Sequence, residues 1–123
     1  NLKVINMIPT QCILWKKDKL TPLDLDPDNF EFVKRLPEIP NVSEQIKRCK
    51  ECGQLYLFEY NDFFASPWSN DLPIYMTYVP ISEEELKEHS QVEKTLTSLL
   101  ENGYPKILHN IKMEGEEVRW NRN

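Results

Sequence analysis

The chain has 123 residues, enough for one hydrophobic core and too few for two ordinary domains, so we expect a single domain over residues 1–123. Hydrophobic residues make up 40% and charged residues 28% of the sequence, which argues against a disordered chain. No apolar run approaches the roughly 20 residues that span a bilayer, and the N-terminal stretch lacks the apolar core of a signal peptide. We therefore expect a cytoplasmic protein with no membrane contact.

The net charge of -5 comes from the second half of the chain. Residues 1–60 carry nine basic and nine acidic side chains, whereas residues 61–123 carry six basic and eleven acidic ones. An acidic surface repels phosphate, which disfavours nucleic-acid binding, and it attracts basic protein partners. The simpler interpretation is that the acidity only aids solubility.

The N-terminal region gives the weakest pattern. Residues 12–21 fit a hairpin that turns at Lys17-Asp18, because Ile13 and Trp15 alternate with their neighbours. Residues 1–8 fit the start of a helical turn equally well.

Two short helices are predicted next. Over residues 27–36, Asp26 is a favoured N-cap, Pro27 suits the first helical position, and apolar residues recur every three positions. Residues 41–49 fit one or two further helical turns, with Ser43 as the cap.

Residues 54–60 and 73–79 predict two central strands, because both are apolar on both faces and need cover on each side. We expect them to pair antiparallel. The tail predicts a hairpin, with strands at 107–113 and 118–120 around a turn at Glu114-Gly115.

The strongest helical pattern covers residues 82–101. Ser82 and Glu85 form a capping box at its start, and a break at His89-Ser90 would divide it into two helices. The predicted fold class is α+β: a small single domain in which helices cover a central antiparallel β-sheet.

A C-x-x-C-G motif precedes the first central strand. Cys49 and Cys52 lie two residues apart, and Gly53 allows the chain to reverse with a positive φ. This stretch of about a dozen residues resembles one half of a zinc ribbon or rubredoxin-type knuckle, which implies two thiolate ligands for zinc. The second C-x-x-C of a full ribbon is absent from the sequence.

The remaining candidate ligands are Cys12, His89 and His109. Two of them would complete a Cys₃His or Cys₂His₂ site, and a dimer could instead share one metal between two pairs. No local spacing links these residues, so a metal-free turn stays open as an alternative. The only cofactor that the sequence indicates is zinc.

A redox role is the weaker alternative for the cysteine pair. Neighbouring cations such as Lys50 favour a thiolate at Cys49. The predicted order of helix, cysteines and strand, however, places Cys49 at the negative end of the helix dipole. Phosphate-binding glycine loops and common catalytic motifs are absent, so we expect a non-enzymatic protein.

The predicted loop at residues 61–72 carries three large aromatic side chains, Phe63, Phe64 and Trp68. Each has about 150–250 Å² of surface that is costly to leave in water. They either fold back onto the core or contact a partner.

In its size, acidity and lack of catalytic motifs, the chain resembles the small cytoplasmic immunity proteins of bacterial toxin–antitoxin and contact-dependent inhibition systems. The resemblance implies a protein that binds a basic, nuclease-like toxin and occludes its active site, with an oligomeric state that is not specified. The partner-binding residues would be the three loop aromatics and the acidic side chains of the second half, namely Asp62, Asp71, Glu83, Glu84, Glu114, Glu116 and Glu117.

Overall fold

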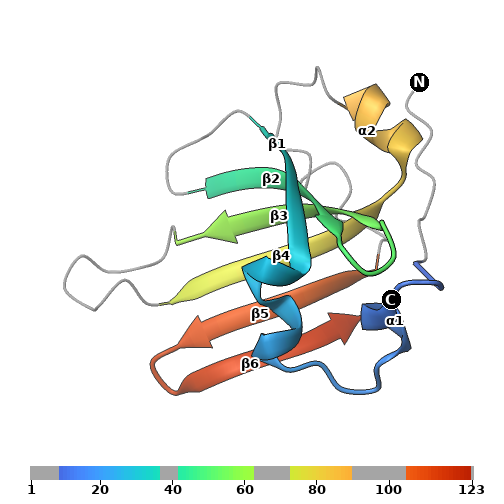
Figure 1. The fold of residues 1–123 in the computed structure, drawn as a ribbon. Helices are drawn as coiled ribbons and strands as arrows, with labels where there is room; N and C mark the ends of the chain where they lie inside the picture. Colours follow the sequence, from blue (N-terminus) through green and yellow to red (C-terminus); the bar gives the residue numbers. More distant parts are fainter. Residues whose placement is uncertain (1–8, 37–41, 63–72, 90–104, 123) are drawn as a thin grey trace.

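The computed structural model describes residues 9–36, 42–62, 73–89 and 105–122. Its centre is a six-stranded antiparallel sheet whose strands lie side by side in chain order (Figure 1). The strands are β1 (Phe30–Arg35), β2 (Val42–Cys49), β3 (Leu55–Asn61), β4 (Ile74–Ile81), β5 (Lys106–Lys112) and β6 (Gly115–Asn121). The helices are α1 (Ile13–Lys16), α2 (Glu83–His89) and the 3₁₀ turns η1 (Pro22–Leu25) and η2 (Pro27–Asn29).

The predicted central strands and the C-terminal hairpin are confirmed. β3 and β4 pair antiparallel, with Leu57 opposite Val79, and both residues are fully buried. β5 and β6 form the hairpin, which turns one residue earlier than predicted because Gly115 already pairs with Lys112. Two-sided apolar runs therefore identified the centre of the sheet correctly.

The predicted helix at residues 27–36 is wrong beyond its first turn. Asp26 does cap η2 by accepting a hydrogen bond from the backbone N–H of Asp28, but β1 begins at Phe30. A register shift between Phe32 and Lys34 lies within β1. Phe30 packs in one apolar cluster, whereas Val33 and Leu36, three positions apart, both pack in the other because the irregularity adds a residue to the strand, and this spacing imitates a helix.

The predicted helix at residues 41–49 is also wrong, because residues 42–49 form β2 between β1 and β3. Backbone hydrogen bonds to the strands on both sides stabilise this segment as a strand. As an isolated helix, so short and polar a segment would be only marginally stable. The cysteine pair therefore follows a strand. This removes the helix-dipole argument that we used against a redox role.

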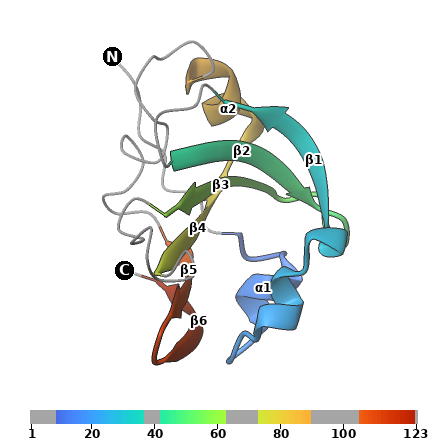
Figure 2. The same cartoon turned by 90° about the vertical axis from the view of Figure 1, so that its left-hand side faces the viewer.

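Two apolar clusters lie on opposite faces of the sheet, because Tyr56 and Phe58 belong to one and Leu55 and Leu57 to the other. Figure 2 shows the sheet curving around the segment that contains α1, with α2 on the other side. We call the face toward α1 the inner face and the face toward α2 the outer face. Leu86 of α2 packs on the cluster of the outer face.

The N-terminal segment covers the inner face without forming the predicted hairpin at Lys17-Asp18. Its buried residues Leu14, Leu20 and Leu25 join Tyr56 in the inner cluster. Residues 1–8 lie outside the described part of the chain.

The capping box at the start of the predicted long helix is confirmed. Ser82 donates its backbone N–H to the Glu85 carboxylate at 3.0 Å, and the Glu85 N–H donates to the Ser82 hydroxyl at 3.1 Å. The helix is described only as α2, and the rest of the predicted segment lies outside the described residues.

The described chain is mostly β, and its helices are short. The predicted antiparallel sheet is confirmed, whereas the α+β class gives too much weight to helical cover. In the part of the chain that the structure describes, no helix has the length and apolar character needed to span a membrane.

Candidate metal centre

The turn between β2 and β3 holds the two cysteines of the C-x-x-C motif. The N–H of Gly53 donates to the carbonyl of Cys49 at 2.8 Å, and the N–H of Cys49 donates to the carbonyl of Gln54 at 2.9 Å. Gly53 has φ of +79°, a conformation that residues with a Cβ rarely adopt. The predicted reversal at this glycine is therefore confirmed.

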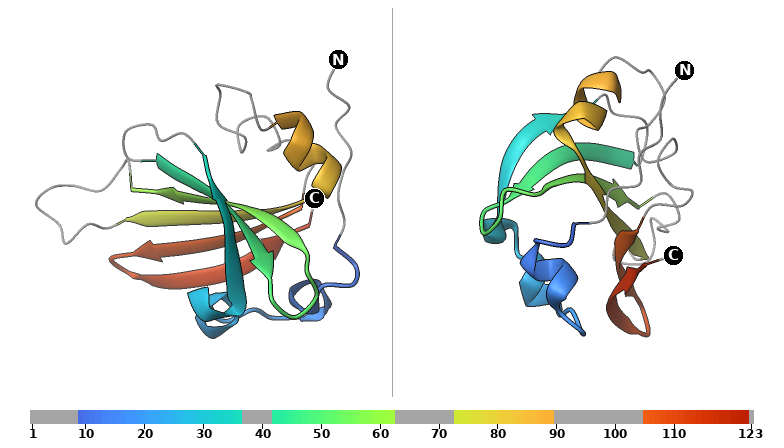
Figure 3. Two further views of the ribbon diagram at one scale, coloured as in Figure 1. Left: turned by 45° about the horizontal axis from the view of Figure 1, so that its top comes forward. Right: turned by 90° about the vertical axis from the view of Figure 1, so that its right-hand side faces the viewer.

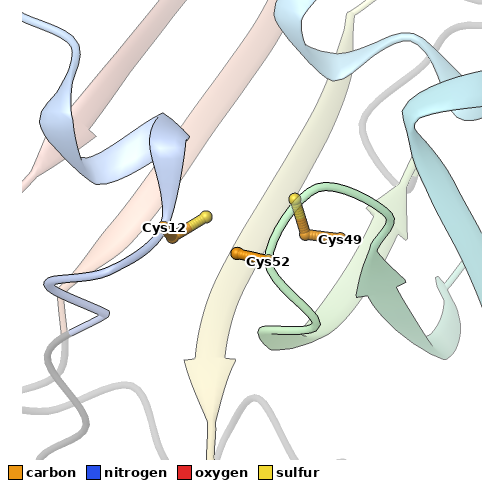
Figure 4. Close-up of side chains that lie close together, drawn as sticks. All are labelled: Cys12, Cys49 and Cys52. Atoms are coloured by element: carbon orange, nitrogen blue, oxygen red, sulfur yellow. The ribbon is translucent and has the colours of Figure 1, made fainter.

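Cys12 joins the pair from the N-terminal segment, immediately before α1. The three Sγ atoms of Cys12, Cys49 and Cys52 all lie within 4.8 Å of one another, and all three thiols are free (Figure 4). Cys12 and Cys49 are buried and Cys52 is exposed. Three cysteines this close can form a metal site.

Contacts with the far edge of the sheet hold Cys12 in place. The indole N–H of Trp120 in β6 donates to the carbonyl of Leu14 at 2.8 Å, and the rings of Trp15 and Trp120 meet edge to face with centroids 4.9 Å apart. The guanidinium of Arg122 lies 4.0 Å from the ring centroid of Trp15. The first and last described segments therefore lie side by side (Figure 3).

Nearby backbone amides act to lower the pKa of each thiol. Those of Cys52 and Glu51 do so at Cys49, and those of Gln54 and Ile13 do so at Cys52. The amide of Leu14 does so at Cys12. Such donors stabilise a thiolate, the form of cysteine that binds metals.

The pKa values of the three thiols shift in different directions, although burial acts to raise each of them. It raises the pKa of Cys49, and it raises the pKa of Cys12 to about 12. Burial also acts to raise the pKa of Cys52, but hydrogen bonds, first from the Gln54 amide and then from Cys12 and Cys49, lower it overall. Two buried thiolates would be costly without a compensating cation, which a divalent metal supplies.

The Tyr56 hydroxyl completes the surroundings of the cluster. It donates a hydrogen bond of 3.0 Å to Sγ of Cys12, and burial raises the pKa of Tyr56 well above its usual range. No local pattern indicates this contact, because in the sequence Tyr56 is one of several apolar residues of a predicted strand.

Of the three additional ligands considered from the sequence, the structure brings Cys12 to the pair. His109 lies on β5, where its Nε2 is 2.6 Å from a carboxylate oxygen of Glu116, and its buried Nδ1 has no hydrogen-bond partner. The side chain of His89 lies outside the described residues.

The predicted partner-binding residues fall in several places. Phe63, Phe64, Trp68 and Asp71 lie outside the described residues, and half-buried Asp62 directly follows β3. The exposed residues Glu83 and Glu84 begin α2, while the exposed residues Glu114, Glu116 and Glu117 surround the β5–β6 turn. These two groups lie apart in the fold (Figure 1).

Three of these carboxylates already have partners within the chain. Glu83 pairs with Arg48 at 3.1 Å, Glu117 pairs with Arg119 at 2.8 Å, and Glu116 contacts His109. The local field of the acidic residues is therefore weaker than their number in the sequence indicates.

Comparison with known proteins gives no relative for this chain: no family model, no curated protein and no solved structure matches it.

Proposed function

We propose that this protein is a zinc-binding module in which Cys12, Cys49 and Cys52 hold one zinc ion. The observation that supports this proposal is the approach of three sulfurs to within 4.8 Å of one another. Sulfurs that share a zinc ion at about 2.3 Å lie roughly 3.8 Å apart in a tetrahedral site, so a small contraction suffices. The backbone donors to each sulfur suit the charged thiolates that zinc requires.

The role of the zinc is to fasten the N-terminal segment to the β2–β3 turn. Cys12 reaches the cluster from this segment, and Cys49 and Cys52 reach it from the sheet. The segment also buries Leu14, Leu20 and Leu25 on the inner face, so the metal would hold these apolar side chains against the sheet. Zinc binding would then contribute to folding stability, as in other structural zinc sites.

Metal analysis tests this proposal. Protein purified without chelators should contain about one zinc per chain, and Cys12→Ser should lower both the zinc content and the thermal stability. Tyr56→Phe is the matched control for the zinc content, because it removes the hydrogen bond to Cys12 without removing a ligand. Purified protein without zinc that also fails to take up added zinc would refute the proposal.

A second candidate function, protein binding of the immunity type, is favoured by the edge of the sheet. β6 is an edge strand, and edge strands and their turns are common recognition sites. The turn that leads into it carries exposed carboxylates beside a hollow of about 240 Å³. A basic toxin whose active site is occluded by this edge is the partner that we propose.

Binding to the product of a neighbouring toxin-like gene tests the second candidate. The double change Glu114→Lys and Glu117→Lys should slow association most strongly at low salt, because charge complementarity acts mainly on the rate of encounter. Glu31→Lys, at an exposed position of the opposite edge strand, is the matched control. Equal association rates for the two variants would exclude the β5–β6 turn from the interface.

A further inference from the structure

A cavity of about 160 Å³ lies beside the three-cysteine cluster. Its walls come from the N-terminal segment, η2, β1 and the start of the β2–β3 turn, and Cys49 belongs both to the cluster and to the wall. The lining residues are Ile13, Leu14, Lys17, Asp24, Asn29, Phe30, Cys49 and Glu51. The volume is well below the roughly 300–1,000 Å³ of sites for drug-sized ligands and above the about 30 Å³ that one water molecule occupies.

The cavity wall carries both signs of charge. The Lys17 ammonium is hydrogen-bonded to the Asp24 carboxylate, whose other oxygen accepts from the backbone N–H of Thr21 at 2.8 Å. Glu51 adds an exposed second carboxylate. Phe30 and the aliphatic side chains of α1 form the apolar part. A small ligand with an ammonium and a carboxylate group would join the Lys17–Asp24 pair, with its carboxylate toward Lys17 and its ammonium toward Asp24 or Glu51.

The cluster itself leaves one position of a tetrahedral zinc site to be filled. Among the residues that the structure describes, no histidine or carboxylate joins the three sulfurs. A zinc ion with three protein ligands accepts an exchangeable fourth ligand. Cys49 belongs both to the cluster and to the cavity wall, so a ligand in the cavity can approach the cluster from the side of Cys49.

We propose that the fourth ligand of the zinc is the sulfur of a small thiol that carries an amino and a carboxylate group, bound in the cavity beside Lys17 and Asp24. The inference rests on the proposed zinc site. On binding, the thiol releases its proton to solvent, a zinc–sulfur bond forms, and the water that filled the position leaves. No oxidation or reduction takes place.

Cobalt-substituted protein provides the test, because the absorption bands of cobalt(II) change when a sulfur ligand replaces an oxygen. The probes are L-cysteine, 2-mercaptoethanol, which lacks both charged groups, and L-serine, which lacks the thiol. A phosphine reductant is present throughout, so that the probes do not act by reducing disulfides. We expect saturable band changes with L-cysteine, at least about tenfold weaker binding of 2-mercaptoethanol and no response to L-serine.

Two neighbouring lysines, Lys16 at the end of α1 and Lys17 directly after it, give a matched pair of variants. Lys17→Ala should raise the half-saturating L-cysteine concentration about tenfold, the order expected when a charged hydrogen-bond partner is lost, without changing cobalt content. Lys16→Ala should change neither, because Lys16 is exposed and outside the cavity wall. Glu51→Gln is a second cavity variant, which should weaken L-cysteine binding without affecting the cluster.

Failure of this inference can be distinguished from failure of the proposed zinc site. Bound cobalt with unchanged bands at excess L-cysteine would overturn the open fourth position while leaving the metal site intact. Equal affinities for the two thiols, or an unchanged half-saturation in both cavity variants, would overturn the charged binding site. Removal of the cobalt by the thiol would overturn the inference as well. A protein that binds no metal at all would refute the proposed function and this inference together.

Discussion

The Tyr56 hydroxyl donates a 3.0 Å hydrogen bond to Sγ of Cys12, joining the third strand to the N-terminal segment within the core. Tyr56 is fully buried and Cys12 is almost so. A donor held at this sulfur orients the thiol toward the cysteine pair and stabilises its deprotonated form. The contact therefore connects the core of the sheet with the proposed metal ligand.

Tyr56→Phe should reduce the free energy of unfolding by about 1 kcal/mol, the typical net contribution of one hydrogen bond. The aromatic ring and its packing against Phe30 are kept, so the loss reports the hydroxyl alone. Urea denaturation with and without zinc measures the effect. A variant as stable as the parent in both conditions would show that the hydroxyl has no energetic role.

Trp120→Phe should weaken zinc binding by up to about tenfold, although Trp120 is not a proposed ligand. The change removes the indole N–H that holds the carbonyl of Leu14 and so loosens the segment that presents Cys12. Competition with a chromogenic chelator measures the affinity. Val118→Ala, on the same strand and face, is the control for a general loss of packing. Equal affinities in the two variants would contradict the role of the indole.

The stability of the metal-free protein should decrease at alkaline pH. Burial raises the pKa of Cys12 from 9.0 to about 12, so the folded protein keeps this proton where the unfolded chain has lost it. The contribution is complete below pH 9 and is lost as the pH rises toward 12. Urea denaturation with a chelator and a reductant, from neutral pH to about 10.5, measures the slope.

Cys12→Ala isolates this contribution from those of the other thiols. Subtracting its pH profile from that of the parent should leave a decrease that begins near pH 9. Parallel profiles would mean that Cys12 ionises alike in the folded and unfolded states.

If the aromatic loop is part of a protein interface, Trp68→Ala should weaken partner binding by at least about 2 kcal/mol, the usual threshold for a hot spot. Titration calorimetry with the partner measures the change, and circular dichroism of the free variant controls for folding. An unchanged affinity would remove the loop from the interface and favour its packing on the core.

The parts of the fold that were predictable from the sequence have local signals. The strands around Leu57 and Val79 are apolar on both faces, and the Ser82 and Glu85 capping box lies within a single turn. The prediction failed in β1 and β2, where pairing with the adjacent strands outweighs a helix-like local pattern. β2 is mostly polar and has little strand character of its own, whereas β1 contains Phe30, Phe32 and Val33, whose spacing resembled a helix; both strands are held by ladders to their neighbours.

In the candidate site, too, the part with a local sequence signal was predictable and the part set by tertiary contacts was not. Cys49, Cys52 and Gly53 are neighbours in the chain, and the turn that they form was predicted from their spacing alone. The selection of Cys12 over His109 depends on where the N-terminal segment lies on the sheet. That position is set by contacts such as the one between Trp120 and Leu14, which join the two ends of the described chain. Local spacing carries no information about such a contact.

The sequential order of the strands also bears on how the molecule assembles. Each strand of the described sheet pairs only with its neighbours along the chain, so the sheet can grow by adding one adjacent strand at a time. The segment with Cys12 differs, because its anchor Trp120 belongs to β6, which is synthesised after the other five strands of the described sheet. We therefore expect this first part of the chain to dock last during folding, so that metal capture marks the completion of the native structure and not its nucleation.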